Sequence, residues 1–236
     1  MSDLCKWLHE QLESLPTISS PFSLENLPEN GIYFFYENGE IWGHYGNKPR
    51  IVRIGTHTGE RNFRSRINQH YLLDESKKMN FEMDKPKISD RSIFRKNIVR
   101  GLLNREKDGY LEIWNIDFTK KLNTKLFGHL RNIEKEKRLE SKITIIIRER
   151  FSFKFIVMDS QKQRKRLERS LIGTIASCKL CKPSGNWLGN YSPKRKIEES
   201  GLWLEQNLTA DKIDENDKDT ILNAISRTKK WITCGL

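Results

Sequence analysis

The sequence lacks any long apolar run. Its uncharged apolar stretches are short, and residues 143–147, for example, are interrupted by Thr144, whereas a helix that spans a bilayer needs roughly 18 to 20 apolar residues. The N-terminus also lacks the basic start and apolar core of a secretory signal. We therefore expect a cytoplasmic protein with no membrane partner, whose four cysteines lie in a reducing compartment.

Several sequence motifs are also missing. Cys178 and Cys181 form one CxxC, but there is no second pair and no histidine nearby in the sequence. The sequence therefore does not support a set of four zinc ligands (a zinc quartet). We expect the two cysteines to be buried thiols without a special role, at the end of a helix. A glycine-rich phosphate loop with its lysine and a GxSxG motif are absent as well, so nucleotide hydrolysis and serine-hydrolase chemistry lack their motifs.

Positive charge, in contrast, is in excess. The 236 residues include 43 Lys and Arg against 31 Asp and Glu, which gives a net charge of +12. An aromatic content of 10% argues against wholesale disorder. A folded, basic chain best matches a polyphosphate backbone, because each neutralised phosphate releases condensed counterions. An anionic membrane surface is the alternative partner.

The apolar spacing predicts an α+β fold, with strands and helices around a small sheet. Strands are expected at 31–37, 51–55 and 151–159, and a further one around 110–116. The first has apolar residues on both faces, which is typical of a strand covered on both sides. The glycine-rich link after it favours an antiparallel hairpin.

Helices are expected at 1–20, 62–73, 89–103, 127–140, 161–177 and 211–231. Residues 143–147 either continue a helix or start a strand, since their β-branching favours strand and their spacing favours helix. Residues 182–201 are rich in Pro and Gly and read as a loop, with Trp187 and Trp203 as anchors.

The chain length favours one large domain with additions. We expect a helix within 1–20 packed on the core, a main domain with inserted helices over 21–208, and a C-terminal helix within 209–236.

Five polar residues lie in or beside apolar surroundings. Glu168 shares a helical face with three apolar residues, where a carboxylate needs a cation or several donors. It suits a metal ligand, or else pairs with a basic neighbour on its own helix. Arg66 and His70, four residues apart, border another apolar face and suit a phosphate clamp and a proton relay, or else a solvated arginine and a hydrogen-bonded histidine. Tyr33 and Arg53 lie within apolar strands and need partners, which for a core tyrosine can be backbone.

Taken in order, these residues resemble the GIY-YIG nuclease family. Gly31-Ile32-Tyr33, then Arg53-Ile54-Gly55, then a helix with Arg66 and His70, and a distant helix with Glu168 together make a specific pattern, although GIY alone is common. The similarity is greatest to the restriction-like bacterial branch and extends over about residues 28–205. It rests on residues 50–57, 66–71, 91–95, 187–189 and 200–203.

The resemblance implies a three-stranded antiparallel sheet flanked by helices, with helical N- and C-terminal additions, and phosphodiester hydrolysis that depends on Mg²⁺ or Mn²⁺. Tyr33 and His70 would activate the attacking water, and Arg66 would hold the scissile phosphate. Glu168 would bind the metal ion, because a hard divalent cation takes a carboxylate oxygen and keeps waters. Arg53 replaces the second motif tyrosine, and would hold phosphate or favour the ionised form of Tyr33.

Further residues are expected to contact nucleic acid. The spacing between the second strand and Arg66 is long, so residues 56–61 should bulge outward and present His57. Arg91, Arg95 and Lys96 give the following helix a basic surface, for which phosphate contact and a merely solvated face are the alternatives.

The predicted function is a metal-dependent endonuclease of duplex DNA, in bacterial restriction or defence. Cutting both strands of a palindrome would favour a homodimer. The alternatives are a non-catalytic nucleic-acid-binding protein with a degenerate site, or a nuclease of repair or of RNA.

Overall fold

The computed structural model describes residues 3–73 and 81–234. Its centre is a four-stranded antiparallel sheet with the order β1-β4-β2-β3. The strands are β1 (Ile18–Ser19), β2 (Gly31–Ile41), β3 (Pro49–Gly55) and β4 (Phe151–Val157). The α+β class and the small antiparallel sheet are thus confirmed, and the fourth strand is a two-residue addition beside β4.

Strand β2 is central because it pairs with both β3 and β4. Its side chains alternate between two faces of the sheet. Tyr33 and Phe35 enter one core cluster, whereas Ile32 and Phe34 enter the other. Both faces are therefore buried, as the apolar sequence of this strand predicts.

Three helices cover the face of Tyr33 and Phe35. They are α2 (Phe63–Tyr71), α3 (Ile93–Arg105) and α6 (Ile133–Arg150). The same core holds Trp187 and Trp203, whose indole N–H groups donate to Glu37 Oε2 at 2.9 and 3.0 Å. Both tryptophans are thus buried anchors, as the sequence predicts.

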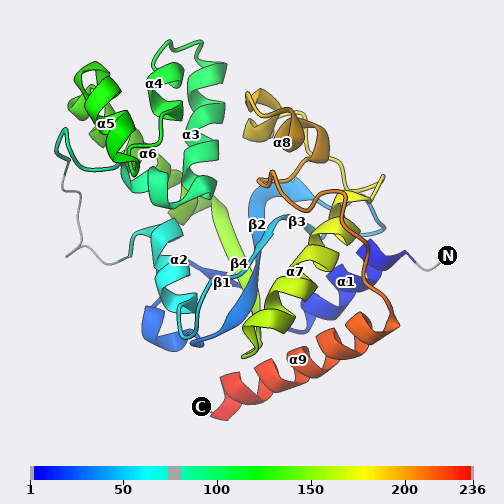
Figure 1. Ribbon diagram of the computed structural model, residues 1–236. Helices are drawn as coiled ribbons and strands as arrows, with labels where there is room; N and C mark the ends of the chain where they lie inside the picture. Colours follow the sequence, from blue (N-terminus) through cyan, green and yellow to red (C-terminus); the bar gives the residue numbers. More distant parts are fainter. Residues whose placement is uncertain (1–2, 74–80, 235–236) are drawn as a thin grey trace.

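The opposite face is covered by α1 (Leu4–Glu13), α7 (Gln161–Ala176) and α9 (Glu215–Cys234). Figure 1 shows α1 and α7 beside the strands, with α9 crossing below them. Leu8 and Leu12 of α1 are fully buried, in line with the leucine spacing of this helix. Residues 1–2 and 235–236 of the expected terminal helices lie outside the described residues.

A helical lobe lies above α2 in Figure 1 and corrects one expectation. The strand predicted around residues 110–116 is the short helix α4 (Leu111–Asn115). Trp114 is buried there and its indole donates to Lys96 O at 3.3 Å, which fixes α4 against α3. This segment pairs with none of the four strands that the structure describes. The packing of Trp114 against α3 therefore determines its conformation.

Other boundaries differ in detail. Residues 143–147 continue α6, and a 3₁₀ turn, η3 (Ile88–Arg91), precedes α3, whose N-cap is Ser92. The elements between α4 and α6 are α5 (Lys121–Phe127) and η4 (Gly128–Leu130), and the loop at 182–201 contains η5 (Leu188–Tyr191) and α8 (Arg195–Ser200). A short 3₁₀ turn, η1 (Leu24–Asn26), precedes β2. Among the described residues, no helix combines the length and the apolar character needed to cross a membrane.

Candidate active site

A chain of three buried polar side chains joins the sheet to α2 and α3. Tyr33 Oη lies 3.0 Å from His70 Nε2, and His70 Nδ1 lies 2.9 Å from Ser92 Oγ. Ser92 is also the N-cap of α3, where its hydroxyl accepts from the Arg95 N–H. The helix start thus fixes the imidazole, and the imidazole fixes the phenol. The sequence prediction missed Ser92, although its position before the apolar spacing of α3 is a typical N-cap signal.

His70 is uncharged at neutral pH. Burial lowers its pKa well below the usual value of 6.5, and the nearby guanidinium groups of Arg66, Arg53 and Arg95 lower it further. A neutral imidazole has one donor nitrogen and one acceptor nitrogen. His70 can therefore accept a proton at one nitrogen while the other holds its hydrogen bond.

Gly55 makes room for the phenol of Tyr33 at the end of β3. A Cβ atom at this position would lie 2.2 Å from Tyr33 Oη, so no larger residue fits without a shift. The next residue, Thr56, donates its backbone N–H to Glu168 Oε1 at 3.0 Å and its hydroxyl to Gly31 O at 2.7 Å. Two consecutive residues of the chain thus hold the phenol and the carboxylate at one end of the strand.

Three predicted site residues line a single cavity of about 410 Å³. They are Arg53 from β3, Arg66 from α2 and Glu168 from α7, and residues 203–207 close the far side. Tyr33 and His70 are fully buried. They lie next to this cavity, because the guanidinium groups of Arg53 and Arg66 are close enough to lower the pKa of His70. The structure therefore brings all five predicted catalytic residues into one region.

Glu168 has the properties of a metal ligand. Burial raises its pKa, while Arg53, the Thr56 N–H and Arg66 act in the opposite direction. Its Oε1 accepts from Thr56, whereas Oε2 has no hydrogen bond or ion pair within the described part of the chain. A carboxylate oxygen free in a cavity fits a hard divalent cation that keeps most of its waters.

The guanidinium of Arg53 is held by a backbone carbonyl, and its Nε–H group has no hydrogen-bond partner in the part of the chain that the structure describes. Its Nη1 donates to Trp203 O and its guanidinium lies 5.2 Å from the Phe94 ring centre. Its Nε is buried without a partner, and such groups are rare in folded proteins. Arg66 is half-buried and donates to Gln69 Oε1 at 2.9 Å and to Arg91 O at 3.4 Å. Both guanidinium groups are thus positioned to receive an anion in the cavity.

The structure corrects two expected nucleic-acid contacts on α3. Arg95 is fully buried, pairs with Glu140 at 2.8 Å and donates to His70 O at 3.0 Å. Lys96 is also buried and pairs with Asp90 at 2.7 Å. These two charges are neutralised inside the protein, so they stabilise the fold and offer nothing to phosphate.

His57 also lies inside the protein, although it was expected on an outward bulge. It is 4% exposed, its Nε2 accepts from the Gly31 N–H at 3.4 Å, and its ring packs on Phe63. Burial, and then Arg164, lower its pKa to about 4. Arg91, in contrast, is exposed beside Arg66.

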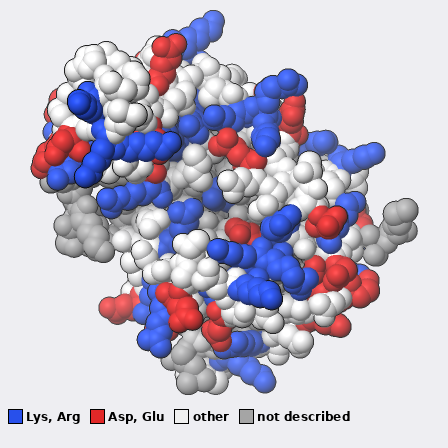
Figure 2. Space-filling model, viewed as in Figure 1, with Lys and Arg blue, Asp and Glu red and all other residues white. Residues whose placement is uncertain are grey.

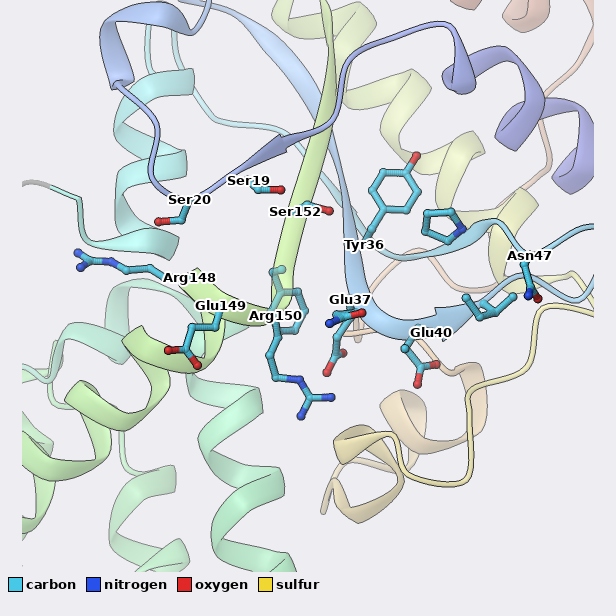
Figure 3. Close-up of a pocket in the computed structure, with 15 residues that line it drawn as sticks. Ser19, Ser20, Tyr36, Glu37, Glu40, Asn47, Arg148, Glu149, Arg150 and Ser152 are labelled. Atoms are coloured by element: carbon cyan, nitrogen blue, oxygen red, sulfur yellow. The ribbon is translucent and has the colours of Figure 1, made fainter.

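A larger cavity, of about 700 Å³, lies at the opposite end of β2 (Figure 3) and contains none of the predicted catalytic residues. Two of its three carboxylates already have partners. Glu37 accepts from two tryptophans, and Glu40 accepts from Arg50 at 2.6 Å and from Ser184. This cavity therefore offers less chemistry than the smaller one around Glu168.

Comparison with known proteins identifies the family. A family model described as a GIY-YIG domain matches residues 2–231, and the chain therefore belongs to the GIY-YIG domain family. This is a family of nucleases, which hydrolyse phosphodiester bonds. No curated protein and no solved structure matched the chain.

Proposed function

We propose that the protein is a divalent-metal-dependent endonuclease of duplex DNA that acts in the bacterial cytoplasm, in restriction or defence. One observation carries this proposal. Arg53, Arg66 and Glu168 line one cavity, directly beside the hydrogen-bonded pair Tyr33 and His70. The similarity of this chain to the restriction-like branch supports the biological role.

In this proposal the two arginines hold the scissile phosphate. Arg66 is partly open to solvent and can meet a phosphate oxygen from the outside. Arg53 lines the same cavity from β3 and places its positive charge there. Negative charge grows on the phosphate oxygens during hydrolysis, and preorganised donors in a buried site stabilise that charge strongly.

Tyr33 and His70 would remove the proton of the attacking water. The phenol takes up this proton as it passes its own to His70 Nε2, 3.0 Å away. For this transfer Nδ1 must carry the ring hydrogen, which Ser92 Oγ can accept at 2.9 Å. The depressed pKa of His70 keeps the imidazole neutral and ready to accept at neutral pH.

Glu168 would hold the metal ion, Mg²⁺ or Mn²⁺. Its Oε2 has no partner among the described residues, and one carboxylate with substrate oxygens and waters is a usual Mg²⁺ environment. When bound, such an ion stabilises charge on the phosphate and on the leaving oxygen. The Thr56 N–H fixes the carboxylate through Oε1, so Oε2 is the oxygen that would bind the ion.

The charge distribution supports DNA as the substrate. Figure 2 shows Lys and Arg side chains around a hollow near the centre of this face. Arg91, Lys165 and Arg169 are exposed and neighbour the residues of the cavity. Cleavage of both strands of a palindrome would favour a two-fold homodimer.

Incubation of a supercoiled plasmid with the protein and Mg²⁺ tests the proposal. We expect cleavage by the wild type, and a loss of about 10²-fold or more for Glu168→Gln, which keeps the Thr56 hydrogen bond but removes the charge. Arg66→Ala should lose a similar factor. Glu149→Gln, at the larger cavity of Figure 3, is the matched control and should cut like the wild type.

Equal cutting by Glu168→Gln and the wild type, at equal thermal stability, would contradict the proposed site. Run-off sequencing of the cut plasmid would then report strandedness and sequence preference, and a parallel assay on RNA would test the RNA alternative.

Arg53 at the position of the second motif tyrosine supports one other candidate function, a binding protein without catalysis. Salt-dependent DNA binding together with no nicking under Mg²⁺ or Mn²⁺ would favour it.

A further inference from the structure

Four potential metal ligands meet at the opposite side of the sheet from Tyr33. The two thiols of the CxxC motif, Cys178 and Cys181, are joined by Cys5 and His44, and the four ligand atoms all lie within 4.8 Å of one another. The CxxC motif alone did not support a zinc quartet, because the other two ligands are distant in the chain. The fold supplies them.

The spacing within this cluster is that of a tetrahedral site. Cys5 Sγ lies 3.6 Å from Cys181 Sγ, and Cys178 Sγ lies 3.6 Å from His44 Nε2. Bonds of about 2.3 Å from zinc to sulfur and about 2.0 Å to nitrogen place tetrahedral ligands roughly 3.5 to 3.8 Å apart. A disulfide would need about 2.05 Å between sulfurs, and all four cysteines of the chain are free.

The groups behind the ligands also fit a metal site. His44 presents Nε2 to the cluster, while its Nδ1 lies 3.1 Å from Asp3 Oδ2. A carboxylate behind a ligating histidine is the usual way to fix its tautomer and orientation. The Gly43 N–H donates to Cys181 Sγ at 3.5 Å. A single cluster thus has ligands and their supporting hydrogen bonds.

His9 lies close by but is excluded as a ligand. Its Nε2 accepts from the Ile51 N–H at 3.2 Å, so Nδ1 carries the hydrogen and donates to Cys5 O at 2.9 Å. Both nitrogens are therefore occupied. The cluster has three thiols and one imidazole, which is a closed set of four ligands.

We propose that Cys5, His44, Cys178 and Cys181 form a structural zinc site. Three thiolates and one imidazole in a tetrahedral arrangement are typical of structural zinc, and four protein ligands leave no position for water or substrate. Cys5 and Cys181 are buried, and only 3% of the His44 side chain is exposed. The ion would be held inside the protein, where it has no direct part in hydrolysis.

The site would connect three distant segments. Cys5 belongs to α1, His44 to the link between β2 and β3, and the CxxC to the loop after α7 (Figure 1). The link and the loop are in close backbone contact, because a Cβ atom at Gly43 would lie 1.8 Å from Leu180 O. Zinc would thereby anchor the end of α7, the helix that carries Glu168 about 15 Å away.

Metal analysis of the full-length protein, purified under reducing conditions without added metal, tests this proposal. We expect about one zinc ion per chain. His44→Ala and Cys178→Ser should lose most of it, whereas His44→Cys, which keeps four ligands, should retain it. Cys234→Ser, at an exposed cysteine, and Glu168→Gln should both retain zinc, which separates this site from the proposed catalytic metal.

A second readout does not depend on the variants. Replacement of the ion by Co²⁺ should give the thiolate charge-transfer and d–d absorption of a tetrahedral S₃N site. Removal of zinc from the wild type by a chelator should lower its melting temperature, and zinc but not Mg²⁺ should restore it.

Wild-type protein that holds no zinc, and takes up none on reconstitution with reduced thiols, would overturn the proposal. Full zinc content in His44→Ala together with Cys178→Ser would overturn it as well. Neither result depends on nuclease activity, so the zinc site and the proposed function can fail separately.

Discussion

Tyr33 has two separate tasks. Its ring packs against Phe35 and Phe63 in the core, with ring centres 4.7 and 6.3 Å apart. Its hydroxyl contacts His70, in a chain that ends at the N-cap of α3. A core tyrosine and a catalytic tyrosine therefore look the same in the sequence, and only the partner of the hydroxyl distinguishes them.

Tyr33→Phe should separate these two tasks. The ring still fills the core, so the loss of stability should be about 1 to 3 kcal/mol, the cost of leaving His70 without its partner. Plasmid cleavage should fall by about 10²- to 10⁴-fold, because the proton relay to the imidazole is gone. Rates of cleavage and urea unfolding of the same preparations measure both effects.

Tyr71→Phe is the matched control. Tyr71 is equally buried in the same core, and its hydroxyl donates to Phe151 O at 3.2 Å. Its loss should cost similar stability and leave cleavage unchanged. Equal activity losses in the two variants would mean that Tyr33 acts only through packing.

Two arginines at the start of α3, one in η3 and one in α3 itself, show that residue type alone does not decide whether a charge is exposed. Arg91 and Arg95 are four residues apart and look alike in the sequence, but Arg91 is exposed whereas Arg95 is paired with Glu140 from a different helix. The acid that neutralises Arg95 lies 45 residues further along the chain. Residue type alone therefore predicted a basic surface where the fold has a buried ion pair.

At the scale of elements, α6 shows how spacing overrides β-branching. A strand would place residues 143, 145 and 147 on one face, whereas a helix places only 143 and 147 together. Ile143 and Ile147 are fully buried and Ile145 is 54% exposed, as in a helix. Tertiary packing of one apolar face outweighs the modest helix propensity of isoleucine.

Alanine substitutions should reproduce this pattern. Ile143→Ala should lower the free energy of unfolding by about 2 to 5 kcal/mol, because it removes buried methyl groups and leaves a cavity. Ile145→Ala, from the same residue type two positions away, should change it by no more than about 0.5 kcal/mol. Urea unfolding measures both values. Similar losses at the two positions would indicate that the segment is not helical here.

Elements with strong local patterns were predictable. The three main strands and the helices α2 and α7 lie where alternation or helical spacing placed them. The failure at α4 has a physical cause, since five residues are too few to show a period and Trp114 packs by contact with α3. In the same way, the ordered motif pointed to Tyr33, Arg66, His70 and Glu168, but Ser92 and the partners of Arg53 depend on how distant helices and loops meet.

At the scale of the whole molecule, the burial of titratable side chains makes the stability of the fold depend on pH. The ring of His57 is buried, and its pKa is lowered to about 4 by burial and by Arg164. In the unfolded chain a histidine gains a proton near pH 6.5, whereas folded His57 stays neutral down to about pH 4. The unfolded state therefore binds more protons in this window, and stability is lost as the pH falls. Glu168 has the opposite sign, because burial raises its pKa and the folded state takes up its proton first.

His57→Gln should isolate the histidine contribution. Glutamine cannot gain the proton, so the stability advantage of the wild type over this variant should shrink by up to about 1.4 kcal/mol per pH unit as the pH falls from about 6.5 to about 4. Glu168→Gln should show the reverse trend, with the wild type gaining relative to the variant at acid pH. His129→Gln, at an exposed histidine, should keep a constant offset. Urea unfolding at several pH values, without added Mg²⁺ or Mn²⁺, measures each difference. A constant offset for His57→Gln would mean that His57 gains its proton as readily in the folded protein as in the unfolded chain, which its burial against Phe63 and beside Arg164 argues against.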